Sequence, residues 1–486
     1  PFLPLISPAS NYPPPVAYNA PDSAGPFHRA PSVSGSRAKA ASMEKVDALI
    51  KAQWTIPVEP DCSALENWAV AVRNGRIAAL GPAEEMESRY RAESVVNRPG
   101  HLLIPGLVNA HTHAAMTLLR GLANDVPLMT WLKKHVWPAE QRWMSAEFVE
   151  HGTELAVAEM LLGGTTTFND MYFFPEVSAR VAARRGIRAV IGMIVVEFSN
   201  SWADDARACI RQGLRLRDEY KGHPLVNTAF APHAPYSVSD ESLSKVRRLA
   251  DELDVPIHMH VHETREEIQE SLENFGCRPL ERLDRLGLVS PLLAAVHMTQ
   301  LDDGEAERVA DAGVSVVHCP ESNLKLASGF CPVAQLAALG VNVAIGTDGA
   351  ASNNDLDMLG EMRSAALLAK GVASDPAALG AGAALTAATL GGARALGLAA
   401  DTGSITPGKW ADLCCVDLGH PATQPVYDAL SQLVYASSRD QVSHVWVAGR
   451  EVVRERRLMT MEAGPAITEA QAWRDRIARA DREKSR

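Results

Sequence analysis

The strongest constraint on the fold is an alternation of short apolar runs with helix-like segments between residues 102 and 396. Apolar runs of this length, separated by segments with helical character, predict buried parallel strands joined through βαβ units. Clear helix candidates are 147–162, 239–253 and 356–369. Eight strand–helix units over this length predict an α/β fold, a (β/α)8 barrel of the TIM type. The eight candidate strands are 102–109, 165–170, 189–196, 226–232, 256–262, 293–297, 314–319 and 342–348.

Both ends of the chain predict β-structure outside the barrel. Two strand-like runs, 69–73 and 76–80, flank Asn74-Gly75, and this dipeptide is a strong hairpin signal. The runs 411–417 and 444–449 also resemble strands, so we expect one small β domain assembled from both chain ends. The predicted boundaries are 43–100 and 401–462 for the two parts of this domain, 101–400 for the barrel and 463–486 for a C-terminal helix.

Residues 1–42 differ in composition from the rest of the chain. They contain Pro13-Pro14-Pro15 and many further prolines among Ser, Ala and Gly, a composition that cannot bury a core. The segment lacks the basic start and continuous apolar centre of a secretory signal. We therefore expect a disordered, Pro-rich tail without a function, followed by folded sequence from Met43 onward.

Composition excludes several functional classes. A net charge of −11 and the absence of a basic block argue against nucleic acid or an anionic membrane as a partner. No apolar run is long enough to span a bilayer. The seven cysteines are odd in number and lack CxxC spacing, which favours free thiols in a reducing cytoplasm over a disulfide framework.

Chemically active residues follow the ends of several predicted strands. Catalytic groups of such barrels lie at the carboxyl ends of the strands, so these residues should meet at one rim. A single histidine at a strand end is more often structural, but several at the same rim are difficult to explain in that way. The residues are His111, His113, His233, the segment 260–263, His297 and Asp348.

The histidine pattern itself points to a metal. His111 and His113 are spaced i, i+2 at the end of a strand, so both imidazoles face one side and can bind a single ion. Taken alone, the pair could equally consist of hydrogen-bonding histidines. In 258–262, three histidines alternate, and spacing does not decide which of them is a ligand. Glu263 can reach the same site only if its strand ends or bends after His260.

These features resemble the amidohydrolase superfamily. The similarity is carried by NAHTHAAMTLLRGLANDVPLMTWL, FAPHAPYSVS, HMHVHET, HCPESNLKLASGF and IGTDGAASNNDLDMLGEMR, between about residues 100 and 370. The HxH motif is common in the superfamily, whereas TLLRG, NLKLASG and TDGAASNN are more specific. Within the branch that resembles triazine hydrolases, the chain is most similar to the 5'-methylthioadenosine/S-adenosylhomocysteine deaminases. This resemblance also implies that the small β domain is a β-sandwich.

The resemblance implies a catalytic centre with one divalent metal ion per subunit. Its ligands would be His111, His113, His260 and Asp348, with water as the remaining ligand. Zn²⁺ is expected, and Fe²⁺ or Mn²⁺ also suits this ligand set. Glu263 would protonate the ring nitrogen, while His297 and Asp348 would orient the water and accept its proton. Metal-bound hydroxide would then attack C6 of an adenine and release ammonia.

The resemblance also implies how a purine nucleoside binds. His233 would contact the purine, Glu140 would accept hydrogen bonds from the ribose, and Trp131, with Trp137, would line the base pocket. Without the family resemblance, Glu140 would be interpreted as a carboxylate on the surface of a helix. Relatives that bind the amino-acid tail of S-adenosylhomocysteine use arginines after the third strand, where this chain has Met193 and, less clearly aligned, Arg207. An apolar Met193 favours 5'-methylthioadenosine. The family further implies a homo-oligomer, either a dimer or a tetramer.

Two alternatives compete with this prediction. The first is an aminohydrolase or chlorohydrolase that acts on another ring, such as a guanine, a pterin or an s-triazine. Glu263 favours deamination, because halide departure does not require ring protonation, and Glu140 favours a ribose. The second alternative is a barrel that retains the fold but serves as a scaffold, which the complete set of expected ligands argues against.

Overall fold

The computed structural model describes residues 43–126 and 128–484 of the chain. The predicted Pro-rich tail, residues 1–42, lies outside the described residues. Among the described residues, no helix is both long and apolar enough to cross a membrane.

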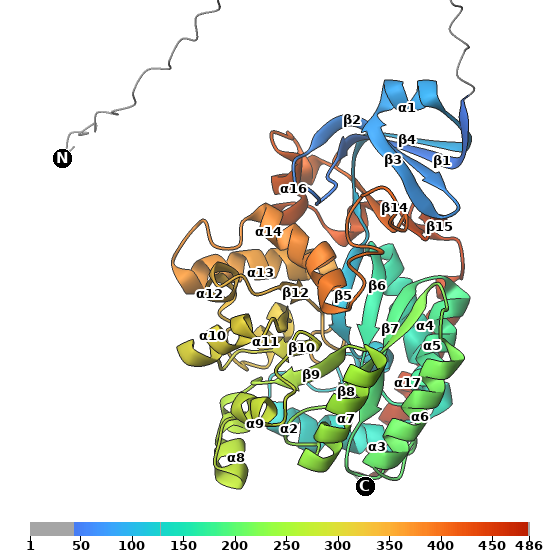
Figure 1. The fold of residues 1–486 in the computed structure, drawn as a ribbon. Coiled ribbons are helices and arrows are strands. Elements are labelled where there is room, and N and C mark those ends of the chain that lie inside the picture. The colour runs from blue at the N-terminus through green and yellow to red at the C-terminus, as the bar shows by residue number, and fades with distance from the viewer. Residues whose placement is uncertain (1–42, 127, 485–486) are drawn as a thin grey trace, which may run out of the picture. The chain divides into compact units, whose positions relative to one another are not determined.

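The predicted barrel is present. Eight parallel strands pair in chain order, and β12 lies against β5, so the sheet is nearly closed (Figure 1). At this junction the backbone N–H of Asp348 donates to the carbonyl of His111 at 3.0 Å. Nearly every strand residue is buried, as expected when helices cover the outside of a barrel. The strands are β5 (Leu107–Thr112), β6 (Thr165–Asp170), β7 (Arg188–Val195), β8 (Val226–Pro232), β9 (Ile257–Val261), β10 (Leu293–His297), β11 (Ser315–His318) and β12 (Val343–Ile345).

Helices follow the barrel strands, and several of them begin with a side-chain cap. Ser239 accepts a hydrogen bond from Ser242 N at the start of α7, and Asp302 closes a capping box at the start of α10. The helices are α4 (Ala146–Leu162), α5 (Pro175–Arg185), α6 (Ala206–Glu219), α7 (Asp240–Leu253), α8 (Arg265–Phe275), α9 (Pro279–Arg285), α10 (Asp303–Asp311), α11 (Pro320–Lys325), α12 (Val333–Ala338), α13 (Met358–Ala373), α14 (Ala381–Thr386) and α15 (Gly392–Ala395).

The second sheet is built from both chain ends, as predicted. Its eight strands run in the order β16-β15-β14-β13-β4-β1-β2-β3, and β13 from the C-terminal part pairs antiparallel with β4. Asn74 and Gly75 form the expected hairpin turn, with φ values of 51° and 74°. The strands are β1 (Glu44–Thr55), β2 (Leu65–Arg73), β3 (Arg76–Pro82), β4 (Tyr90–Pro105), β13 (Leu413–Asp417), β14 (Val442–Val447), β15 (Arg450–Arg454) and β16 (Arg457–Leu458). The helix α1 (Ala83–Arg89) packs beside β2, β3 and β4, and α16 (Ala429–Tyr435) packs against α13 and α14.

The first predicted strand, 102–109, is divided between the two sheets. β4 continues to Pro105, and the barrel strand β5 begins at Leu107. Gly106 allows the close passage, because a Cβ there would lie 2.1 Å from the hydroxyl oxygen of Thr166. The apolar run continues through both strands, so hydrophobicity alone could not reveal the change of sheet. The predicted boundaries between domains stay a prediction.

A buried ion pair joins the two parts. Arg188 on β7 donates to both carboxylate oxygens of Asp412, at 2.7 and 3.1 Å. Both side chains are buried, and Asp412 also accepts from the hydroxyl of Thr402 and the backbone N–H of Ala448. The bidentate geometry and additional donors satisfy the charges that burial removes from water.

A long helical excursion covers the carboxyl end of the barrel between β5 and α4. It consists of η1 (Ala114–Leu119), α2 (Leu128–Trp131), the π-helical turn η2 (Leu132–Val136) and α3 (Trp137–Trp143). The chain ends in α17 (Ala463–Lys484), which packs against α4.

Candidate active site

Four of the predicted ligands converge at the carboxyl end of the barrel. His111 lies on β5, His113 directly follows it, His260 lies on β9, and Asp348 follows β12. The Nε2 atoms of His111 and His113 are each 3.2 Å from Oδ1 of Asp348. Nε2 of His260 lies 3.2 Å from Nε2 of His111, and one donor atom from each of the four residues lies within 4.8 Å of the others.

Hydrogen bonds behind the cluster prepare its nitrogens for metal binding. Nδ1 of His113 donates to the carbonyl of Met171 at 2.6 Å, and Nδ1 of His260 donates to the carbonyl of His233 at 2.7 Å. A carbonyl only accepts, so the proton of each ring lies on Nδ1 and Nε2 presents a lone pair to the centre. His111 is oriented by His258, whose Nε2 lies 2.8 Å from Nδ1 of His111.

The charge state of the cluster also fits a divalent cation. Burial lowers the pKa of His111 and of His260, so both imidazoles are neutral. Burial acts to raise the pKa of Asp348, but the adjacent His111 and His113 hold it well below its usual range. The hydroxyls of Ser322 and Ser352 donate to Oδ2 of Asp348, at 2.6 and 2.8 Å, and leave Oδ1 facing the histidines. Imidazole nitrogens with one carboxylate form a suitable donor set for zinc.

The strand β9 ends early enough for Glu263 to turn into the site, as its predicted role requires. β9 stops at Val261, and His262 has a φ of 55°, in the left-handed region, which turns the chain and brings Glu263 into the site. His262 itself leaves the site: its Nε2 accepts from the backbone N–H of Leu280 at 3.0 Å. Of the three alternating histidines, His260 joins the cluster, His258 supports it from behind, and His262 does neither.

Glu263 is positioned and neutralised by its surroundings. The backbone N–H groups of His262 and Glu263 donate to the carboxylate of Glu267, at 3.0 and 2.6 Å, which fixes the bend. Burial raises the pKa of Glu263 well above its usual range, and the nearby Asp348 and Glu267 raise it further. Oε2 of Glu263 lies 3.8 Å from Nε2 of His297, whose pKa burial lowers to about 3. A carboxyl whose pKa is raised therefore lies beside an imidazole whose pKa is lowered, a pairing suited to proton transfer.

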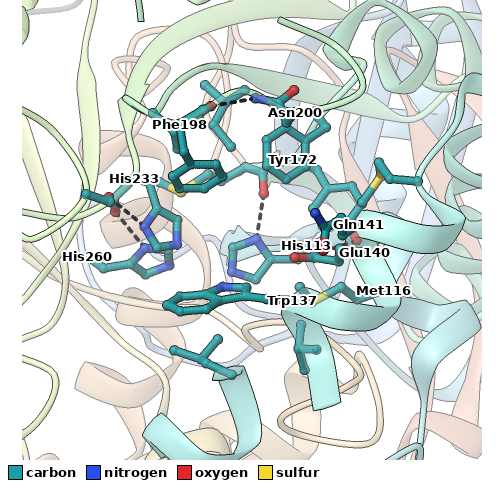
Figure 2. A pocket seen from close by; sticks show the side chains of 18 of the residues that line it. His113, Met116, Trp137, Glu140, Gln141, Tyr172, Phe198, Asn200, His233 and His260 are labelled. Carbon is teal, nitrogen blue, oxygen red and sulfur yellow. Dashed lines mark hydrogen bonds between the residues drawn. The ribbon is translucent and has the colours of Figure 1, made fainter. Parts of the chain in front are cut away.

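A cavity of about 800 Å³ opens onto this cluster. Its walls include the metal-ligating candidates His113, His260 and Asp348, whereas His111 lies behind them. Figure 2 shows His233 and His260 on one side of the cavity, Glu140 on the opposite side, and His113 between them. Further predicted residues that line the cavity are Glu263, His297, Trp131 and Trp137.

Glu140 lies inside the cavity wall and not on the outer surface. It is on α3, and Oε1 accepts a hydrogen bond of 2.8 Å from the hydroxyl of Tyr172. Burial raises the pKa of Glu140 to about 7, although the Tyr172 hydrogen bond acts in the opposite direction. On the other side, Nδ1 of His233 lies 2.9 Å from the hydroxyl of Ser237. Burial lowers the pKa of His233 to about 3, so its ring is neutral.

The prediction that Met193 lines the substrate pocket is wrong. Met193 is buried on the outer face of β7, where it packs against Gly213 of α6; a Cβ on Gly213 would lie 2.7 Å from its Cβ. Strand alternation instead turns the neighbouring Ile194 and Val196 toward the cavity. Arg207 is exposed and pairs with Glu241 at 2.9 Å. Among the described residues that line the cavity there is no arginine, and Lys133 is the one lysine.

Sequence reasoning missed several supporting residues: Tyr172, His258, Glu267, Ser322 and Ser352. His258 carries a signal in the alternating histidines, and Ser322 lies within a resembling stretch. Ser352 also lies within such a stretch, four residues after Asp348, and Glu267 acts on the bend four and five residues before it. The role of Tyr172 depends on a contact with a distant segment.

Comparisons with known proteins agree with this site. A model of the amidohydrolase family matches residues 102–452, and one of the bacterial imidazolonepropionase-like composite domain matches residues 69–92. A 5-methylthioadenosine/S-adenosylhomocysteine deaminase of Teredinibacter turnerae is 47% identical over 89% of this chain and 98% of that protein. The crystal structure of an adenosine deaminase from Xanthomonas campestris with bound zinc has a TM-score of 0.89 at 53% identity, and covers 90% of this chain and 99% of that one.

A structure with lower sequence identity has the same fold and is described as an enzyme that acts on a different substrate. The atrazine chlorohydrolase of Arthrobacter aurescens, complexed with zinc, has a TM-score of 0.81 at 25% identity and covers 88% of this chain and 99% of that chain. The family match includes the barrel strands, the four clustered donors and the strands β13 and β14 of the second sheet. The chain therefore belongs to the amidohydrolase family of hydrolytic enzymes.

Proposed function

We propose that the protein is a metal-dependent hydrolytic deaminase that converts 5'-methylthioadenosine to its inosine analogue and ammonia. One observation carries the proposal: the cavity that opens onto the four clustered donors is also lined by Glu263 and by the ribose acceptor candidate Glu140. The deaminases among its relatives support the same reaction class. S-adenosylhomocysteine and adenosine are further candidate substrates.

His111, His113, His260 and Asp348 would hold one divalent metal ion, for which we propose Zn²⁺. The pre-oriented Nε2 atoms support this assignment, and the Xanthomonas campestris relative is described with bound zinc. When bound there, the ion would lower the pKa of water toward neutrality and so supply a nucleophile at physiological pH.

The protein's own groups would carry the protons. Glu263, whose pKa burial raises, would donate from its carboxyl to the ring nitrogen beside the carbon that is attacked. His297 orients the attacking water through Nε2, and the carboxylate of Asp348 accepts the proton that this water loses. Transfer of that proton to the departing amino group would release ammonia and restore the carboxylate of Asp348. The hydroxyl proton left on the attacked carbon would pass to Glu263 as the product carbonyl forms, which restores its carboxyl. Because these groups are buried, bulk water cannot compete for the protons.

Opposite sides of the cavity would bind different parts of the nucleoside. His233 would hydrogen-bond the purine, and Glu140 would accept from the ribose hydroxyls. Trp131 and Trp137 supply apolar walls for the base and sugar. Tyr172 leaves one carboxylate oxygen of Glu140 without a hydrogen bond among the described residues, which suits a diol partner.

The preference for 5'-methylthioadenosine is supported by different residues from the one predicted. Ile194 and Val196 provide the apolar wall that was expected of Met193. The absence of an arginine among the described lining residues disfavours the α-carboxylate of S-adenosylhomocysteine. A methylthio group would not require a charged partner.

The cellular location, the oligomeric state and the partners of the enzyme are also proposals. Each of the seven cysteines is a free thiol, which supports a reducing cytoplasm. A homo-oligomer, either a dimer or a tetramer, and the lack of a nucleic-acid or membrane partner remain predictions.

Ammonia release from a panel of substrates tests the proposal. Zinc-loaded protein and a chelator-treated control are incubated with 5'-methylthioadenosine, S-adenosylhomocysteine, adenosine, adenine, guanine and an s-triazine. We expect 5'-methylthioadenosine to give the highest kcat/KM and the chelator to abolish turnover. Preference for S-adenosylhomocysteine would refute the apolar-tail argument alone. Turnover of free bases or triazines without nucleoside turnover would refute the proposed substrate class.

A further inference from the structure

The C-terminal helix α17 (Ala463–Lys484) follows the last strand of the second sheet. It lies outside the residues matched by the family model and packs along α4 and against η1 (Figure 1). Its buried face includes Trp473 and Ile477, whose rings and methyl groups belong to the same apolar cluster as Trp131, Leu132 and Met144. Several members of that cluster line the substrate cavity from the opposite side.

Trp473 is held firmly in this position. Its side chain is 3% exposed, and its indole N–H donates to Nδ1 of His151 on α4 at 3.1 Å. Its ring packs edge-to-face on Phe148, with centroids 5.2 Å apart, and the guanidinium of Arg476 lies 4.2 Å from its centroid. Aromatic and cation–π contacts of this kind add to the free energy gained from burial.

The same ring contacts the end of the helix that carries Glu140. Trp143, the last residue of α3, meets Trp473 edge-to-face, with centroids 6.3 Å apart and planes at 82°. Trp143 lies three residues after Glu140, so it belongs to the same helical turn, and Met144 N donates to the carbonyl of Glu140 at 2.9 Å. A displacement of Trp143 therefore displaces the backbone of Glu140.

The α3 segment depends on such external support. It has seven residues and follows a π-helical turn of five, and helices this short are marginal without tertiary packing. Its inner side borders the cavity of about 800 Å³. On its outer side, Trp473 contacts its last residue, Trp143.

We infer that Trp473 is a positioning residue: through Trp143 it fixes α3, and thereby sets the affinity of Glu140 for the substrate's ribose. The inference rests on the proposed function, in which Glu140 binds the sugar. Trp473 does not touch the cavity, so its contribution should appear in KM and leave the chemical step at the metal cluster unchanged.

The test compares Trp473→Ala with Trp446→Ala. Trp446 is equally buried but lies in the β-sandwich core, so it controls for a general loss of stability. We expect Trp473→Ala to raise KM for 5'-methylthioadenosine about tenfold and to leave kcat and metal content near wild type. Trp446→Ala should leave KM unchanged. Trp473→Leu, which retains apolar volume, replaces the alanine variant if that variant does not fold.

A double-mutant cycle shows whether the effect passes through Glu140. In a Glu140→Gln background, Trp473→Ala should raise KM no more than about twofold, because the interaction it positions is already lost. A full tenfold increase in that background would overturn the inference. An equal increase in KM for Trp446→Ala, or a loss of kcat and metal in place of KM, would also overturn it.

Limited trypsin digestion tests the positioning without any substrate. Lys133 and Lys134 are exposed in η2, directly before α3. Cleavage there should be faster in Trp473→Ala than in the wild type or in Trp446→Ala. Equal cleavage rates would refute the support of α3 by α17. If wild-type protein deaminates no nucleoside but the cleavage rates differ, the proposed function fails and the mechanical support remains.

Discussion

Replacement of Glu140 by glutamine probes the part of the site that distinguishes a nucleoside from a free base. The substitution keeps the size of the side chain and the possibility of a hydrogen bond from Tyr172, and it removes the negative charge. A hydrogen bond to a charged acceptor contributes about 1.5–3 kcal/mol. Loss of that contribution at the ribose raises KM by roughly 10- to 150-fold. Other residues carry out the chemistry at the attacked carbon, so kcat should change far less than KM.

The pH dependence gives the same experiment a second readout. Burial raises the pKa of Glu140 to about 7, so the carboxylate that accepts from the ribose is lost as the pH falls below neutrality. Wild-type 1/KM for the nucleoside should therefore decline below about pH 7, and Glu140→Gln should show no such decline. Because a raised carboxyl pKa makes the folded state less stable as pH rises through that pKa, Glu140→Gln should also gain stability above neutrality.

Initial rates of ammonia release at several pH values measure both effects. The 2'-deoxy and 3'-deoxy analogues of the substrate serve as controls, because they lack one hydroxyl each and should lose less affinity on Glu140→Gln than the parent nucleoside does. Tyr172→Phe removes a hydrogen bond that lowers the pKa of Glu140, so the decline in 1/KM should move to higher pH. An unchanged KM in Glu140→Gln, or the same loss for all three nucleosides, would refute the assignment of Glu140 to the ribose.

Three further substitutions test other parts of the account. Asp348→Asn should abolish turnover and lower bound metal, as measured by elemental analysis, and substantial remaining activity would contradict its double role. Glu263→Gln should retain the metal and reduce kcat by roughly 10²- to 10⁴-fold; loss of metal would instead make Glu263 a ligand. Asp412→Ala leaves Arg188 buried without its ion pair and should lower the free energy of unfolding by about 3–5 kcal/mol in urea titrations, with a change under about 1 kcal/mol contradicting the importance of this pair.

The barrel and its cluster could be predicted because they depend on local sequence patterns. Apolar strands alternate with helices over the whole barrel, and chemically active residues follow the strand ends, so His111, His113 and Asp348 meet at one rim. The alternating histidines could not be resolved in the same way. The resemblance singles out His260. The left-handed bend at His262 removes that histidine from the site, and His258 lies behind His111, and no spacing rule reveals either placement.

The failures of the sequence prediction have equally specific causes. The family resemblance places Met193 in the pocket, whereas the alternation of β7 turns its side chain outward and presents Ile194 and Val196. Tyr172 and Trp473 act on Glu140 and Trp143 from distant parts of the chain. Contacts of this kind are set by how helices and loops pack over the barrel rim, and neither hydrophobic periodicity nor motif spacing contains that information.

Reconstitution of the metal-free enzyme tests the central claim most directly. Apoprotein is titrated with Zn²⁺ while ammonia release from 5'-methylthioadenosine is followed, with His260→Ala as the matched control. The account predicts that the rate rises in proportion to added metal, reaches its plateau at one equivalent per chain, and stays near zero in His260→Ala. Full activity of the metal-free protein, a plateau at two equivalents, or no deamination after complete loading would contradict a nucleoside deaminase built around one metal ion.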